Sequence, residues 1–201
     1  GDEIIQYTDK DGIRQAIIST RRGRGPWDAV ELADNNPNRI IPSVRIKGKH
    51  YTRNTKKYFK KLNKQVNRGE YKAMAEVHMF HAQKGDKADE VEVHVNDDRI
   101  QKTLSAAIDN GWPFVVHIEF SSLSSSDAQG FMKELETLLA DNPGHPFVLI
   151  HMGQLDESRV ERLLVKYKNI HFLTSHADTI SVSGSNQPWV NMFDDENLKP
   201  Q

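Results

Sequence analysis

The chain has 201 residues and a mass of 23.0 kDa, with 27% charged residues and a formal net charge of -1 at pH 7. A chain of this length can bury a substantial core, and its near-neutral balance gives no electrostatic reason to expect nucleic acid or a membrane surface as partner. No apolar run approaches the roughly 20 residues of a membrane helix, so we expect a soluble protein, with a preference for the cytoplasm. The absence of cysteine excludes disulfides and thiolate metal sites, so any metal must be held by imidazole and carboxylate groups.

The first half of the chain alternates helical patterns with short apolar runs. Apolar residues at helical spacing predict the helices, most clearly at Tyr58, Leu62 and Val66. Lysines fill the other face of that helix and favour a solvated surface, since no nucleic-acid motif accompanies them. In chain order the expected elements are helix 2–11, strand 13–20, helix 27–36, strand 39–46, helix 52–68 and strand 71–80.

The second half begins with a long polar stretch, residues 81–98, which is predicted to be an active-site loop because it is too long for a simple connector. Two later segments repeat one pattern: Pro113–Phe120 and Pro146–Gly153 each open with Pro-Phe, continue through aliphatic residues and reach a histidine. Such runs are typical of buried parallel strands. Helices are predicted over 98–110, 127–141 and 156–168, and strands over 113–120, 146–153 and 169–177.

Six strand-then-helix units follow one another at intervals of ~20–40 residues, a period typical of a parallel α/β sheet. A closed TIM-type (β/α)8 barrel takes ~250 residues, so the chain corresponds to about six of its eight units. We expect a single partial domain over residues 1–201. An open doubly wound sheet is the alternative, but no Gly-x-Gly-x-x-Gly turn follows any strand.

Polar and ionisable side chains gather at the carboxyl ends of the predicted strands, where parallel α/β proteins carry their chemistry. Because side chains alternate across a strand, placing His117 on the inner face also places Glu119 there. The polar residues that the same alternation places on the inner face of their strands are Ser19, Ser43, Arg45, Glu76, His78, His117, Glu119, His151 and Ser175.

This set favours a metal or acid–base site, although a single histidine at a strand end is more often a hydrogen-bonded core residue. The imidazoles of His117 and His151 suit zinc, and Glu76 would complete the ligand set or take a proton from metal-activated water. Arg45 would bind a substrate carboxylate, with an ordinary surface arginine as the alternative. The remaining histidines are set aside because they fall in predicted loops, at strand starts or on the opposite parity: His50, His81, His94, His145, His171 and His176.

Six strand segments follow one another in the order GIRQAIIST, NPNRIIPSVRI, AMAEVHMF, PFVVHIEF, HPFVLIHMG and KNIHFLTSHA. This ordered set resembles a known family, the amidohydrolase-related branch of the amidohydrolase superfamily, which includes aminocarboxymuconate-semialdehyde decarboxylase. The resemblance covers nearly the whole chain, from Ile4 to about Trp189. It implies a (β/α)8 barrel with His117 as the metal ligand of the fifth strand, His151 as the sixth-strand histidine and Glu76 as a fourth-strand acid.

Two features of that family are absent from the sequence: the His-x-His of the first strand and the aspartate of the eighth strand. Both would fall at the ends of the barrel. A barrel without its first and last strands would expose two edges and an unfilled interior, so we expect the sequence to be a fragment.

The residues and the resemblance together predict a hydrolase that uses metal-activated water on a small, carboxylate-bearing molecule. A divalent metal, zinc first, is the expected cofactor, and a homodimer is left open. The alternatives are a non-hydrolytic decarboxylase of the same branch and a catalytically inactive, ligand-binding barrel. The predicted catalytic residues are His151 and Glu76, the metal ligands His117, His151 and Glu76, and the substrate-binding residues Arg45, His78 and Ser175.

Overall fold

The computed structural model of the chain describes residues 2–20, 24–46, 48–86, 89–174, 193–194 and 197–198. Six main strands are present in this part of the chain: β1 (Ala16–Ile18), β2 (Ile40–Arg45), β3 (Ala73–His81), β5 (Phe114–Ile118), β6 (Phe147–Leu149) and β7 (Ile170–Phe172). Their hydrogen-bonded order in the sheet is β1-β2-β3-β5-β6-β7. Parallel pairing joins β1 to β2, β2 to β3, and β6 to β7.

The strand order identifies the fold class. In a (β/α) barrel each strand lies beside its predecessor, whereas a doubly wound sheet reverses its order at a switch point. The order of the six strands has no reversal. The predicted TIM-type (β/α)8 architecture, with about six βα units in this chain, is therefore confirmed over the described residues, and the doubly wound alternative is wrong.

The chain divides into two compact units, each built from segments that are separate in the sequence. The first consists of Gly1–Val77 and Asn96–Val115, and the second of His78–Val95 and Val116–Gln201. Strands β3 and β5 contribute residues to both units. A single domain over residues 1–201 stays a prediction. No helix in the described ranges is both long and apolar enough to span a membrane.

The first unit contains five helices among its described residues. They are α1 (Asp2–Lys10), α2 (Asp28–Asn35), α3 (Lys49–Arg53), α4 (Thr55–Val66) and α5 (Asp98–Asp109). Helix α2 packs against β2, and Val44 and Tyr71 are fully buried in the core of this unit. The predicted helix over 52–68 is divided, because Asn54 leaves helical geometry and its side chain accepts the N–H of Lys57. A side-chain cap of this kind starts a new helix.

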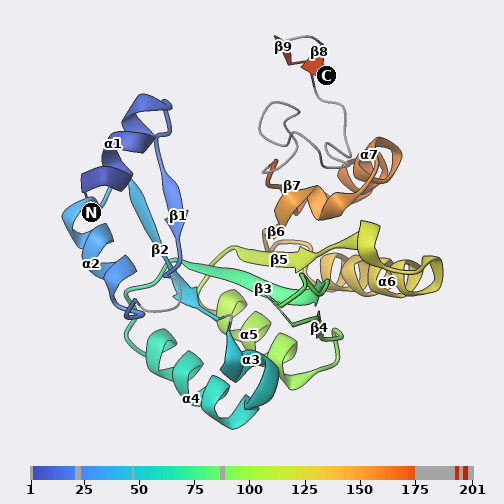
Figure 1. Cartoon of the computed structure of the whole chain (residues 1–201), viewed down its shortest axis with the longest axis horizontal. Coiled ribbons are helices and arrows are strands. Elements are labelled where there is room, and N and C mark those ends of the chain that lie inside the picture. Colours follow the sequence, from blue (N-terminus) through green and yellow to red (C-terminus); the bar gives the residue numbers. More distant parts are fainter. Residues whose placement is uncertain are drawn as a thin grey trace. The chain divides into compact units, whose positions relative to one another are not determined.

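The second unit packs two helices beside the later strands. Its remaining elements are β4 (Val91–Glu92), α6 (Ser125–Asp141), α7 (Glu157–Lys166), the 3-10 turns η1 (Phe120–Ser122) and η2 (Ile150–Gln154), and the pair β8 (Phe193–Asp194) and β9 (Asn197–Leu198). Helix α6 begins after Ser124, whose hydroxyl accepts the N–H of Asp127. Its Phe131 packs against Phe80 of β3, with ring centroids 5.7 Å apart. Helix α7 lies beside β7 (Figure 1).

The strand before His151 is shorter than the sequence predicts. β6 ends at Leu149, and His151, Met152 and Gly153 take left-handed backbone angles, with φ of 54°, 51° and 64°. A side chain on Gly153 would force its neighbours to shift, because its Cβ would lie 2.6 Å from Leu149 Cδ2. The expected strand over 146–153 is thus corrected to 147–149, and His151 lies in a tight turn.

Candidate metal centre

Four histidines of the second unit gather where β3, β5 and β6 end. His78 and His81 belong to β3, His117 to β5, and His151 to the turn after β6. The rings of His78 and His81 stack at 12° with their centroids 5.3 Å apart. The His117 ring lies 4.9 Å from that of His78, 5.2 Å from that of His81 and 5.3 Å from that of His151. This histidine cluster therefore centres on His117.

His81 reaches the cluster because the end of β3 departs from simple alternation. Strict alternation would place His81 on the opposite face from His78. In the structure Phe80 packs against Phe131 of α6, and the next ring, that of His81, stacks on His78. The sequence-based assignment of His81 to a loop is wrong, since it is the last residue of β3. The ring contact with His78 in the folded chain, rather than alternation along the strand, places His81 in the cluster.

Glu119 follows β5 and is buried beside His117. Its Oε2 accepts the N–H of Ala82 at 2.8 Å, and its Oε1 accepts Lys84 Nζ at 2.9 Å and lies 3.3 Å from His117 Nε2. The exposed fraction of the Glu119 side chain is only 2%. Burial alone would raise the pKa of Glu119, but the contacts with His117, Lys84 and Ala82 outweigh it and hold the pKa well below its usual range. Glu119 is therefore a carboxylate at neutral pH.

His81, His117 and Glu119 lie close enough together to be candidate ligands of one divalent metal ion. Each offers one ligand atom, and these three atoms lie within 4.8 Å of one another. His81 Nδ1 is buried and has no hydrogen-bond partner among the described residues. Burial is the main cause that lowers the pKa of His81, so its ring is neutral and keeps a lone pair. Two imidazoles and one carboxylate are a common zinc ligand set, so these residues fit such an ion.

The structure brings together some of the predicted site residues. His78, His117 and His151 meet in the histidine cluster of the second unit. Glu76 and Arg45 belong to the first unit. The guanidinium of Arg45 donates to the carbonyl of Arg24 at 2.8 Å. Ser175 lies outside the described residues, and the functional roles of all these residues stay predictions.

Three residues of the centre were given no role by sequence reasoning. Glu119 was placed on the inner face with His117 by alternation along the strand, but it was not selected as a ligand. His81 carries no such signal, because alternation assigns it to the other face. Lys84 lies in the polar stretch predicted to be an active-site loop, but nothing local indicates that it reaches Glu119.

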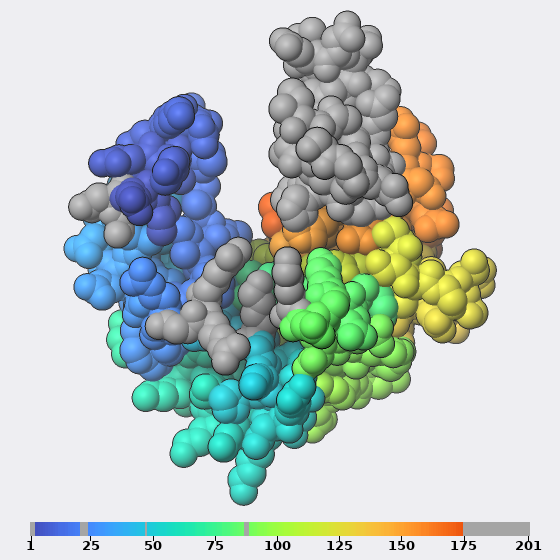
Figure 2. Space-filling model, in the orientation of Figure 1, coloured from blue at the N-terminus to red at the C-terminus, as the bar shows by residue number. Residues whose placement is uncertain are grey.

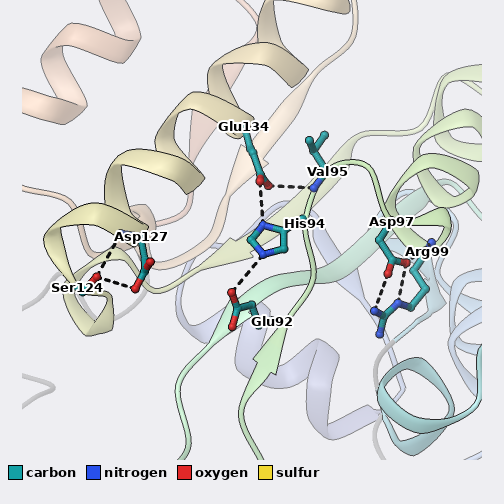
Figure 3. Close-up of polar contacts among 8 residues, drawn as sticks. All are labelled: Glu92, His94, Val95, Asp97, Arg99, Ser124, Asp127 and Glu134. Carbon is teal, nitrogen blue, oxygen red and sulfur yellow. Dashed lines mark hydrogen bonds and ion pairs between the residues drawn. The ribbon is translucent and has the colours of Figure 1, made fainter.

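A further histidine, His94, lies between two carboxylates on the surface of the second unit (Figure 3). Its Nδ1 is 2.8 Å from Glu134 Oε1 and its Nε2 is 3.2 Å from Glu92 Oε1. The hydrogen bond with Glu134 is the main cause that raises the pKa of His94. Glu134 also accepts the N–H of Val95 at 2.9 Å. These contacts fasten the segment after β4 to α6, which is a structural role.

A groove of about 790 Å³ is lined by α6 and α7 and contains none of the clustered histidines. Both helices reach the surface, in yellow and orange in Figure 2. Glu136 of α6 binds Arg162, Lys166 and Tyr167, which reach it from α7 and the residue after it. Burial would raise the pKa of Glu136, but these three partners lower it to about 2. The network joins the two helices.

The fold and the histidine cluster define a class: a (β/α)-barrel protein with imidazoles and a carboxylate at the carboxyl ends of its strands. No protein-family model matches the chain, and no curated protein matches it. Among solved structures, an uncharacterized TIM-barrel protein from Bordetella bronchiseptica is similar to it, with a TM-score of 0.56 and 16% identity over 84% of this chain and 57% of that one.

Two further similar structures are a Staphylococcus aureus protein provisionally assigned as an amidohydrolase and a 2,6-dihydroxybenzoate decarboxylase from Rhizobium. The first has a TM-score of 0.49 and 13% identity over 84% of this chain and 65% of that one. The second has a TM-score of 0.45 and 14% identity over 85% of this chain and 68% of that one. This chain spans 57% of the Bordetella protein and 65% of the Staphylococcus protein, each less than two thirds. Because sequence identity is low, the likeness to the Bordetella protein shows the fold alone.

Proposed function

We propose that this chain carries the metal centre of a metal-dependent hydrolase of the amidohydrolase superfamily, which acts on a small, carboxylate-bearing molecule. One observation supports the proposal above others: His81, His117 and Glu119 direct ligand atoms to within 4.8 Å of one another. They do so at the carboxyl ends of strands, where barrel enzymes carry their chemistry. An ion bound there would act as a Lewis acid and lower the pKa of a water molecule.

The chain's own residues would perform the remaining tasks. The N–H of Ala82 holds Glu119 Oε2, so Oε1 is the oxygen that faces His117. His78 stacks on the His81 ring and restricts its rotation. His151 meets the His117 ring edge to face, with centroids 5.3 Å apart, and from there it would hydrogen-bond to charge that develops on the substrate.

The other predicted site residues enter the proposal on sequence grounds. Glu76 is proposed as a further ligand or proton acceptor. His151 is proposed as a ligand alternative to His81, since both border His117. Arg45, His78 and Ser175 are proposed to bind the substrate.

A second candidate, a barrel that binds a ligand without catalysis, is favoured by one specific contact. Lys84 Nζ lies 2.9 Å from Glu119 Oε1 and already supplies a positive charge to this carboxylate. A chain that never binds metal would be stable with this pair. Zinc binding separates the two candidates.

The test is a calorimetric zinc titration of the purified chain and of four variants. We expect one zinc per chain, and affinity weaker by about 100-fold or more in His81→Ala, His117→Ala and Glu119→Gln, because each removes a ligand. His145→Ala is the matched control: His145 is also a buried histidine of the second unit, but its ring packs on Phe147 at the start of β6. Absence of zinc binding by the wild-type chain would contradict the proposal and support the non-catalytic candidate.

A further inference from the structure

Lys84 and Glu119 form an ion pair between unequal partners. The Lys84 side chain is 55% exposed, whereas that of Glu119 is 2% exposed. Lys84 follows β3 in the polar segment whose Ala82 N–H also binds Glu119. The ammonium group of Lys84 can move into solvent at a small cost in free energy, whereas the carboxylate of Glu119 is buried in the cluster and cannot.

The ammonium group of Lys84 uses the oxygen that faces the imidazoles. Glu119 Oε1 lies 2.9 Å from Lys84 Nζ and 3.3 Å from His117 Nε2, and Oε2 is taken by the N–H of Ala82. A cation held by His81, His117 and Glu119 would therefore need the electron pairs of Oε1. An ammonium and a divalent ion on the same oxygen would repel each other strongly.

We propose that Lys84 is a displaceable counter-ion, which neutralises Glu119 in the metal-free chain and gives up this carboxylate when His81, His117 and Glu119 bind a divalent cation. The displaced ammonium group then lies beside the centre on an exposed segment. A free ammonium group there suits an anionic substrate group such as a carboxylate. The inference rests on the proposed metal site and assigns Lys84 a place in it.

Zinc titration of Lys84 variants tests the competition. Lys84→Met should bind zinc about fivefold more tightly than wild type at low ionic strength, because the competing charge is gone. Lys84→Arg keeps the competing charge and should stay close to wild type. Lys133→Met, which removes an exposed lysine of α6, is the matched control and should leave the affinity unchanged.

Amine labelling of the wild-type chain tests displacement directly. Acetic anhydride, with mass spectrometry as readout, should modify Lys84 severalfold faster after zinc is added, since an ammonium group in an ion pair reacts slowly. Lys133 should react at one rate throughout. Suppose that Lys84→Met binds zinc more tightly than wild type, but zinc leaves the labelling rate of Lys84 in the wild-type chain unchanged. This result would show a distant charge effect and overturn the inference.

The outcomes also separate this inference from the proposed function. If the wild-type chain and Lys84→Met bind zinc equally, Lys84 is not a competitor, and the metal centre stands without it. If neither binds zinc, both proposals fall. Tighter binding by Lys84→Met together with faster Lys84 labelling supports both.

Discussion

Two carboxylates of the second unit, Glu119 and Glu136, share an electrostatic feature but differ in surroundings. In both, contacts with hydrogen-bond donors outweigh burial and lower the pKa. The exposed fraction of the side chain is 2% for Glu119 and 18% for Glu136. Glu136 is bound by Arg162, Lys166 and Tyr167, all of which donate to it.

The difference shows that a lowered pKa does not by itself identify a functional site. The protonated Arg162 and Lys166 have no lone pair to offer a metal, so beside Glu136 they act as hydrogen-bond donors that join two helices. Glu119 lies beside His117 and His81, whose ring nitrogens can act as ligands. The chemistry of the neighbouring groups, rather than the charge of the carboxylate, separates a candidate metal centre from a structural ion-pair network.

Replacing each of the two carboxylates by alanine should give clearly different losses of stability, and this is the largest effect we expect. Glu119→Ala should lower the free energy of unfolding by about 3 kcal/mol, because it leaves the N–H of Ala82 unsatisfied and a polar cavity in the core. Glu136→Ala should cost about 1 kcal/mol, because its partners are near the surface. Urea denaturation of both variants without metal measures the difference. Equal losses would show that the two networks do not differ in the way proposed.

A smaller effect is expected from the turn that carries His151. Gly153→Ala should lower the free energy of unfolding by about 2 kcal/mol, since the left-handed backbone disfavours alanine and its Cβ would meet Leu149. Gly144→Ala is the matched control, because a Cβ there meets no atom within 4 Å and its backbone is not left-handed. It should change the stability by less than about 0.5 kcal/mol. Thermal unfolding of both variants checks this, and an unaffected Gly153→Ala would remove the argument for a fixed His151 turn.

The smallest effect concerns the acid stability that Glu136 contributes. The pKa of Glu136 is about 2 in the folded chain and 4.5 ordinarily. The contacts of its carboxylate therefore contribute fully to the free energy of unfolding above pH 4.5, and this contribution is lost as the pH falls toward 2. Arg162 and Lys166 are about half exposed, so the contribution is only about 1 kcal/mol. Unfolding curves of the wild type and Glu136→Gln should therefore differ above pH 4.5 and converge at lower pH. A constant difference would contradict the assignment.

Much of the fold could be predicted from sequence because local patterns fix it. Helix α6 follows from its apolar spacing and its serine cap, and each of the six predicted strands overlaps an observed strand. The last predicted strand, 169–177, is corrected at its end, because β7 stops at Phe172 and residues 175–177 lie outside the described residues. The limits of β6 could not be predicted, because IHMG has the composition of a strand, whereas His151, Met152 and Gly153 take left-handed backbone angles and form a turn. Asn54 likewise divides one predicted helix into α3 and α4 through a cap that the apolar pattern hides.

The candidate site was predictable in part. The strand-end pattern selected His117, His151 and His78, and the structure brings their rings together. It could not select His81 or Lys84. The stacking of His81 on His78 departs from the alternation expected along a strand, and the contact of Lys84 with Glu119 joins residues 35 positions apart.

Residue types and short-range periodicity predict that this chain alternates strands and helices, lacks thiolate ligands and carries histidines at strand ends. The folded chain alone shows which histidines lie together, which carboxylate contacts them and which lysine pairs with that carboxylate. Those choices depend on packing and charge between distant segments, which short-range patterns do not encode.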